Sequence, residues 1–250
     1  MKWLILASSL LITSLSFAQS WSYQNPAGPN QWGDLSNDFL SCRVGADQSP
    51  IEIESGANAG LINVTSDSSL PTISPNWSPS GLTVMNNGHT VEMLYDEGSH
   101  LEFEGSTLPL KQFHFHSPSE HILDGRQYPL EAHFVHQANG KTMVVGMFFK
   151  LGEENKALSE VWNMAPVTNS TIQHPEIVVN AMDLLPNDLS YFHYTGSLTT
   201  PPCTEGVTWI VLKTPVTASA AQLQFLQKRL AGPNNRPIQP LDGRMIGSIP

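Results

Sequence analysis

Residues 112–121 read QFHFHSPSEH, and residues 130–137 read LEAHFVHQ. In both stretches apolar side chains stand between histidine, glutamine or glutamate. Successive side chains on a β-strand point to opposite faces, so each stretch predicts a strand with one apolar and one polar face. The residues between the two stretches are rich in turn formers, which favours a tight reversal of the chain. We therefore expect two strands that lie side by side as a hairpin.

The alternation also predicts which side chains face a core and which face a site. Phe113, Phe115, Ala132 and Phe134 fall on the apolar faces, whereas the polar faces carry Gln112, His114, His116, Glu131, His133 and Val135. Three imidazoles from two neighbouring strands suit Zn²⁺ and leave a fourth tetrahedral position for water, as in catalytic zinc sites. Gln112 and Glu131 each precede a ligand histidine by two residues, so they are placed to accept its free ring N–H.

The other histidines lack this shared facing. A single histidine is more often a hydrogen-bonded core or surface residue than a ligand. On that basis we interpret His100, His174 and His193 as structural or exposed, and His121 and His136 as polar core residues.

The amino-terminal residues have the pattern of a secretory signal. MKWLILASSLLITSLSFA has one early lysine, an apolar run and small residues before a cleavage point after Ala18. The apolar run is too short to favour a membrane-spanning helix, and no later segment approaches the ~20 apolar residues that spanning requires. We expect residues 1–18 to be a signal peptide and residues 19–250 to form one exported domain, periplasmic or secreted, without a membrane span.

The composition of the chain favours one fold class and argues against one class of partner. Charged residues are only 14% of the chain, and the formal net charge of −10 becomes −11 once Lys2 is removed, which argues against nucleic acid as a partner. Short β-branched or alternating runs separated by turn residues predict a mainly β fold. Two segments, near Glu153–Met164 and Ser219–Leu230, favour helices.

The two cysteines, Cys42 and Cys203, are predicted to pair. An exported chain meets an oxidising compartment, where an even number of cysteines tends to form disulfides. Thiolate ligation of a metal is the weaker interpretation, because neither cysteine sits in a Cys-x-x-Cys pair.

Eight short motifs in order resemble the α-class carbonic anhydrases: QSPIEI, NNGH, QFHFH, SEH, EAHFVH, GSLTTPP, VTWIVLK and NRPIQPL. They are spread over nearly all of the chain after the signal. The resemblance implies a twisted, largely antiparallel central sheet of about ten strands with short peripheral helices. It also implies a conical cleft that ends at zinc, and hydration of carbon dioxide to bicarbonate by a zinc-bound hydroxide. A homodimer would rest on resemblance to some secreted bacterial relatives alone.

The resemblance carries roles over to single residues. His114, His116 and His133 resemble the zinc ligands, with Gln112 and Glu131 behind them. Glu120 and Thr199 resemble the pair that orients the bound hydroxide, and His89 resembles the proton shuttle. Positions matching the carbon dioxide pocket and the water chain to the shuttle are Val135, Val144, Leu198, Thr199, Thr200, Val207 and Trp209, and Tyr23, Asn87 and Gln112, respectively. The apolar set equally fits ordinary strand core, and His89 equally fits a turn after Asn-Gly.

Two departures from the family pattern are visible. Ser117 and Pro118 follow His116 where the familiar animal pattern has tryptophan and glycine, and Glu92 stands where many relatives have a neutral side chain. Neither removes a ligand.

Two other functions were weighed. An inactive carbonic anhydrase-like zinc-binding module would be expected to lose a ligand histidine, and none is lost. A cupin would share the spacing His-x-His-x₃-Glu. The cupin pattern, however, has glycines at set distances on both sides of this core, and this chain has Leu108 and Gln127 at those positions.

Overall fold

The computed structural model describes residues 20–55, 64–67, 69–167, 169–230 and 232–249. The predicted signal peptide, residues 1–18, lies outside these described residues. Within them, no helix is both long enough and apolar enough to cross a membrane.

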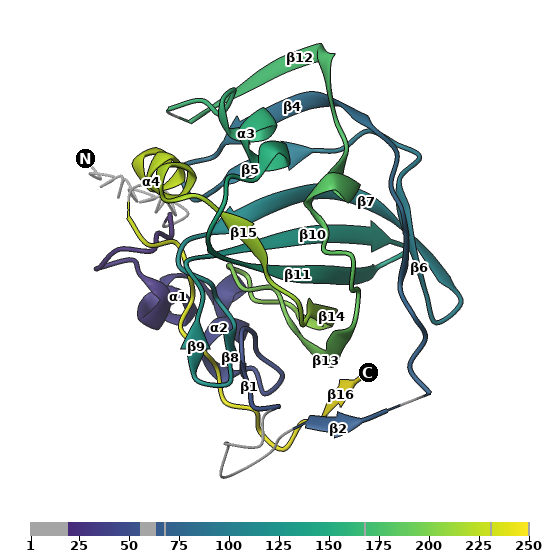
Figure 1. The fold of residues 1–250 in the computed structure, drawn as a ribbon. Coiled ribbons are helices and arrows are strands. Elements are labelled where there is room, and N and C mark those ends of the chain that lie inside the picture. The colour runs from purple at the N-terminus through teal and green to yellow at the C-terminus, as the bar shows by residue number, and fades with distance from the viewer. Residues whose placement is uncertain (1–19, 56–63, 68, 168, 231, 250) are drawn as a thin grey trace, which may run out of the picture.

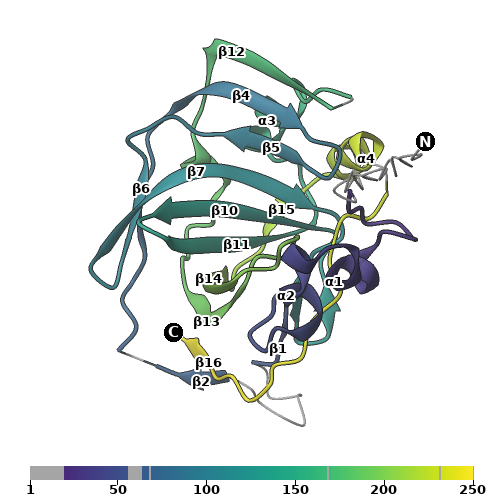
Figure 2. The same cartoon turned by 180° about the vertical axis from the view of Figure 1, so that it is seen from behind.

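One large twisted sheet dominates the described part of the chain, as Figures 1 and 2 show from opposite sides. Its main path runs β12 (Ser170–Val179), β4 (Ser80–Asn86), β5 (Val91–Leu94), β7 (Ser106–His116), β10 (Leu130–Ala138), β11 (Lys141–Leu151), β14 (Glu205–Leu212), β13 (Tyr191–Ser197), β16 (Ile246–Ser248) and β2 (Val64–Ser66). Off this path lie β3 (Ser74–Asn76), β6 (His100–Phe103) and β15 (Val216–Ala218). Most neighbours are antiparallel, while β11 runs parallel to β14 and β15, and β16 to β2. The predicted mainly β, largely antiparallel sheet is confirmed.

The remaining elements are short and lie around the large sheet (Figure 1). A small sheet contains β1 (Glu52–Ile53), β8 (Ile122–Leu123) and β9 (Arg126–Gln127). The α-helices are α1 (Trp32–Leu35), α2 (Ser41–Val44), α3 (Lys156–Trp162) and α4 (Ala220–Arg229). The 3₁₀ turns are η1 (Pro29–Gln31), η2 (Asn37–Phe39) and η3 (Ala181–Leu184).

Both predicted helices exist, and side-chain caps explain where they begin. The first starts at Lys156 rather than Glu153, because the Asn155 side chain accepts the backbone N–H of Leu158 at 3.2 Å. The second starts after Ser219, whose hydroxyl accepts the N–H of Gln222 in a reciprocal capping box.

Two apolar clusters occupy the two faces of the sheet around β7 and β10. Phe113, Phe115 and Phe134 are fully buried in the larger cluster. Val135 belongs instead to the smaller cluster, which contains Trp209. The expected division of these strands into a core face and a second face is therefore confirmed.

The predicted disulfide joins Cys42 of α2 to Cys203, which lies between β13 and β14. Both cysteines are buried, and they pack with Trp32 in a small cluster of their own. The bond spans 161 residues of sequence and fastens an amino-terminal helix to the segment that contains Thr199.

Removing this bond should lower stability. Replacing both Cys42 and Cys203 by serine should cost about 2–5 kcal/mol, because an unfolded chain without the cross-link gains conformational entropy. Urea unfolding at neutral pH measures the loss, with the reduced parent protein as the control. An unchanged free energy of unfolding in the double variant would contradict a stabilising role.

Candidate metal centre

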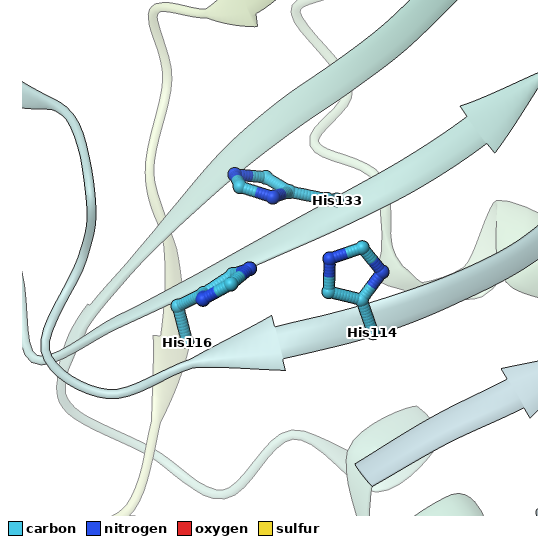
Figure 3. Close-up of side chains that lie close together, drawn as sticks. All are labelled: His114, His116 and His133. Atoms are coloured by element: carbon cyan, nitrogen blue, oxygen red, sulfur yellow. The ribbon is translucent and has the colours of Figure 1, made fainter. Parts of the chain in front are cut away.

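Three histidines meet where β7 and β10 run side by side. His133 on β10 lies directly opposite His114 on β7, and His116 follows two residues further along β7. One ring nitrogen of each histidine lies within 4.8 Å of the other two, and Figure 3 shows the three rings turned toward one another. β7 and β10 are thus antiparallel neighbours as expected, although β8 and β9 lie in the connection between them, and their pairing brings the three candidate ligands together.

In each ring, the nitrogen that points away from the other two histidines contacts a hydrogen-bond acceptor of its own. Gln112 Oε1 lies 2.8 Å from Nδ1 of His114, and Glu131 Oε1 lies 2.9 Å from Nε2 of His133. The backbone carbonyl of Asn234 lies 2.8 Å from Nδ1 of His116. Carboxylate and carbonyl oxygens only accept hydrogen bonds, so these ring nitrogens donate. The nitrogens left to face the centre are Nε2 of His114, Nε2 of His116 and Nδ1 of His133.

These inward nitrogens fit a metal ion. Nε2 of His116 is buried and has no hydrogen-bond partner among the described residues. An unpaired buried polar atom costs about 1–3 kcal/mol, so a structure that leaves one there is suited to a ligand that takes its lone pair. Three neutral imidazoles form the donor set that zinc favours in catalytic sites.

Burial also keeps the ligand histidines in the form that binds metal. Loss of hydration lowers the pKa of His116 to about 4 and holds the pKa of His114 well below its usual range. It lowers the pKa of His133 as well, although Glu131 acts in the opposite direction. At neutral pH the rings are therefore uncharged, and each has a free lone pair.

Glu131 anchors the site from behind. Its Oε2 accepts the backbone N–H groups of Glu120 and His121 at 2.8 and 2.9 Å, and its Oε1 lies 2.7 Å from Nδ1 of His121. Burial alone would raise the pKa of Glu131, but His121 and His133 hold it well below its usual range. His121, Glu131 and His133 also lie close enough together for a metal. Their facing atoms already bond one another, so a hydrogen-bond network explains this second group.

His121 continues the network away from the candidate ligands. Its Nε2 lies 2.7 Å from the hydroxyl of Tyr194, which lies 2.9 Å from the hydroxyl of Ser49. His121 is fully buried, as is His136, in agreement with their interpretation as polar core residues.

Glu120 lies close to the histidine group and is less completely paired than Glu131. Its Oε1 accepts the backbone N–H of Arg236 at 2.8 Å, whereas Oε2 has no hydrogen-bond partner of normal geometry among the described residues. Burial raises the pKa of Glu120 to about 7, and the nearby Thr199 hydroxyl is one of several groups that oppose this rise. Thr199 thus lies beside Glu120, as the resemblance implied, but without a well-formed hydrogen bond to Oε2.

An apolar wall adjoins the histidines. Val135 on β10 pairs with Val144 on β11, which pairs with Trp209 on β14, and the Trp209 ring lies 4.9 Å from the His133 ring. Val207 belongs to the same buried cluster, and Leu198 packs against it. The structure therefore gathers these predicted residues, and Leu198 leads directly into Thr199 and Thr200.

His89 lies in the turn between β4 and β5, half-buried rather than in the core. Its ring stacks on Trp21 with 3.7 Å between centroids, and the Tyr23 ring lies 6.4 Å away. Burial lowers the pKa of His89. The side chain of Asn87 accepts the backbone N–H groups of His89 and Thr90, so it shapes the turn itself.

Sequence reasoning missed three residues that act around the site. Trp21 stacks on His89, Asn234 supports His116 and Arg236 supports Glu120. Both supporting contacts come from backbone atoms, which leave no mark in the choice of side chain. The motif NRPIQPL contains Arg236 but neither Asn234 nor Trp21, and it indicated no role.

Comparison with known proteins gives one consistent result. Residues 27–249 match the family described as eukaryotic-type carbonic anhydrase. A carbonic anhydrase of Neisseria gonorrhoeae is 42% identical over 90% of this chain and 86% of its own length. The structure of a hyperthermostable carbonic anhydrase from a hydrothermal vent chimney superimposes with a TM-score of 0.86 at 41% identity, covering 92% of this chain and 100% of that one. The α-carbonic anhydrase of Thermovibrio ammonificans, solved with the inhibitor sulfanilamide, gives 0.85 at 42% identity, covering 92% and 99%. The chain belongs to the α-carbonic anhydrase family.

Proposed function

We propose that the chain catalyses the reversible hydration of carbon dioxide to bicarbonate and a proton, with Zn²⁺ held by His114, His116 and His133. One observation carries the proposal. Three buried ring nitrogens face one another, while the opposite nitrogen of each ring is hydrogen-bonded to a fixed acceptor. Family membership supports the same reaction. When bound, zinc supplies a Lewis acid that lowers the pKa of a coordinated water toward neutrality, an effect for which carbonic anhydrase is the standard example.

Glu120 and Thr199 orient the attacking group in this proposal. A threonine hydroxyl that donates its hydrogen to the Glu120 carboxylate can only accept a hydrogen bond from the attacking group. That group then directs a lone pair toward the carbon atom under attack, which reduces the orientational freedom lost in the transition state. The adjacent backbone N–H of Arg236 holds one oxygen of Glu120 in place for this role.

The apolar wall serves as the carbon dioxide pocket. Carbon dioxide has no charge and no hydrogen-bond donor, so a surface of aliphatic and aromatic side chains suits it better than a polar one. The residues assigned to this surface are Val135, Val144, Leu198, Val207 and Trp209, with Thr200 further along the same segment.

His89 carries protons between the site and bulk water. Regeneration of the nucleophile releases a proton, and imidazole exchanges protons readily near neutral pH. The half-buried place of His89 against Trp21, with Tyr23 close by, puts the ring between solvent and the interior. Tyr23, Asn87 and Gln112 are proposed to support the water path.

For the location of the protein we propose export after cleavage at residue 18, which the Cys42–Cys203 disulfide supports.

The direct test is carbon dioxide hydration followed by stopped-flow. The purified protein should hydrate carbon dioxide rapidly, lose that activity when a chelator removes its metal, and regain it with added Zn²⁺. Circular dichroism before and after chelation is the control for folding. A folded, zinc-loaded protein without hydration activity would refute the enzyme and leave an inactive zinc-binding module.

Replacing His89 by alanine should slow turnover on the order of 10²-fold in weak buffer, because the proton then lacks a carrier. Concentrated imidazole buffer should restore much of the rate, since a soluble base replaces the missing ring. The matched control is His174→Ala, which alters a half-buried histidine on β12 that contacts Glu176. Equal rates for His89→Ala and the parent in weak buffer would exclude the shuttle role.

The metal-free protein should become less stable as the pH falls from 6.5 to about 4. Unfolded His116 binds a proton near pH 6.5, whereas in the folded chain its pKa is lowered to about 4. The unfolded state therefore holds more protons across this interval, so acid favours unfolding, and the full contribution to stability is present only above pH 6.5. Urea midpoints at several pH values should show a steeper loss for the parent than for His116→Asn. Parallel slopes for the two proteins would contradict the assignment.

A further inference from the structure

A short carboxy-terminal segment, residues 234–236, touches three parts of the site at once. The Asn234 carbonyl accepts from the ring of His116, and the Arg236 backbone N–H donates to Glu120. The Asn234 side-chain N–H groups donate to the carbonyl of His89 at 3.0 Å and to that of Phe115 at 2.9 Å. The orientation of these groups therefore depends on where this segment lies.

The segment has no regular structure to hold it. Residues 233–241 belong to neither a helix nor a strand, so no ladder of backbone hydrogen bonds fixes their path. Two separate backbone hydrogen bonds hold the segment, from the Asn234 N–H to the Ser117 carbonyl at 3.3 Å and from the Gln239 N–H to the Pro50 carbonyl at 2.7 Å, and side chains add further restraint. On one side, Ser117 gives its backbone N–H to Asn234 Oδ1 at 2.8 Å. On the other side the restraint comes from Arg236.

The Arg236 guanidinium is almost fully buried, with 1% of the residue exposed. It donates to Gln48 Oε1 at 2.8 Å, to the Ser49 carbonyl at 2.7 Å and to the Cys42 carbonyl at 2.9 Å. The Trp32 ring lies 5.9 Å from its central carbon. Among the described residues no carboxylate forms an ion pair with it. The planar guanidinium donates to three neutral oxygens of three different residues, and this clamp is an arrangement that lysine cannot reproduce.

The residues that receive this clamp are fastened to the segment that contains Thr199. Cys42 is disulfide-bonded to Cys203, and Gln48 Nε2 donates to the Cys203 carbonyl at 3.1 Å. Ser49 and Ser197 exchange two hydrogen bonds, at 2.9 and 3.1 Å. One connected set of contacts thus runs from Glu120 through Arg236 and residues 42–49 to the two ends of the Thr199 segment.

We propose that Arg236 is a positioning residue of the metal centre, which sets the place of Glu120 relative to Thr199 and fixes the ring of His116 through the Asn234 carbonyl. It acts through the backbone of residues 234–236 and touches neither substrate nor metal. This inference rests on the proposed function, whose reaction and metal it refines.

Arg236→Lys tests the clamp, because it keeps the charge and removes the fork. The variant should release zinc to a competing chelator about tenfold faster than the parent, the low end of the effect of supporting residues on metal retention. Its kcat for carbon dioxide hydration should fall about tenfold with KM changed less than about twofold, since the apolar wall is untouched.

The matched control is Arg244→Lys. Arg244 also donates to the backbone of Gln48, at 2.8 Å, and to Leu241 and Thr195, but it has no hydrogen bond to residues 234–236. This variant should leave zinc release and kcat within about twofold of the parent. A loss shared equally by both arginine variants would assign Arg236 a general structural role and overturn the proposal.

Zinc release and kcat unchanged in Arg236→Lys would also overturn it. If that variant does not fold, Gln48→Met decides, because it removes one of the three guanidinium acceptors; faster zinc release supports the clamp, and unchanged release refutes it. The zinc-release measurement does not require activity. If the parent protein does not hydrate carbon dioxide, the proposed function is refuted, but zinc release still tests whether Arg236 supports His116 through the Asn234 carbonyl.

Discussion

The antiparallel pairing of β7 with β10 is the constraint on which the site depends. The register that sets His133 opposite His114 also sends Phe113 and Phe134 to the apolar side of the sheet. Moving either strand by one residue would exchange its two faces, with phenylalanine in the site and histidine in the core. Each buried phenylalanine stabilises the fold by about 1.5–3 kcal/mol, so the core enforces the register that the metal centre needs.

Two buried glutamates show how hydrogen bonding separates roles within one low-dielectric region. The pKa of Glu131 is held well below its usual range, whereas that of Glu120 is raised to about 7. Both are desolvated, but Glu131 also accepts two backbone N–H groups and contacts two imidazoles. Glu120 accepts one backbone N–H and keeps an oxygen without a partner. A fully satisfied carboxylate is fixed, whereas a partly satisfied one retains an oxygen that can accept a further hydrogen bond.

Residues whose positions follow the alternation of a β-strand were predictable from the sequence. Alternation placed His114, His116 and His133 on one face. The two-residue offset correctly indicated Gln112 and Glu131 as the acceptors of His114 and His133. The expected export and the even number of cysteines were enough to predict the disulfide. The mainly β class followed from the short alternating runs, and the approximate number of strands from family resemblance.

Apart from the disulfide, contacts between distant segments were not predictable, for a physical reason. The carbonyl of Asn234 meets His116 across 118 residues of sequence, and any residue type has a carbonyl to offer. The ring of Trp21 stacks on that of His89, and no fixed spacing in the sequence indicates such a contact. The start of α3 moved to Lys156 because the Asn155 cap decides where its first turn forms. This cap is local, whereas the contacts of Asn234 and Trp21 arise only once the sheet has set the distances between segments.

The Cys42–Cys203 bond has two physical effects that act on different states of the chain. As a cross-link over 161 residues it restricts the unfolded ensemble, which affects stability regardless of what lies near the sulfur atoms. In the folded state it also aligns the residues that receive the Arg236 guanidinium with the segment that leads from Thr199 to Cys203. If the bond were removed, a stabilising solute would compensate for the lost stability, because it favours any compact state. The solute would not restore the alignment in the folded state, because the position of Glu120 relative to Thr199 depends on specific contacts rather than on compactness. The proposed positioning role of Arg236 therefore implies that stability and catalysis are coupled through residues 42–49 and 234–236, although the candidate ligands themselves lie on the central strands.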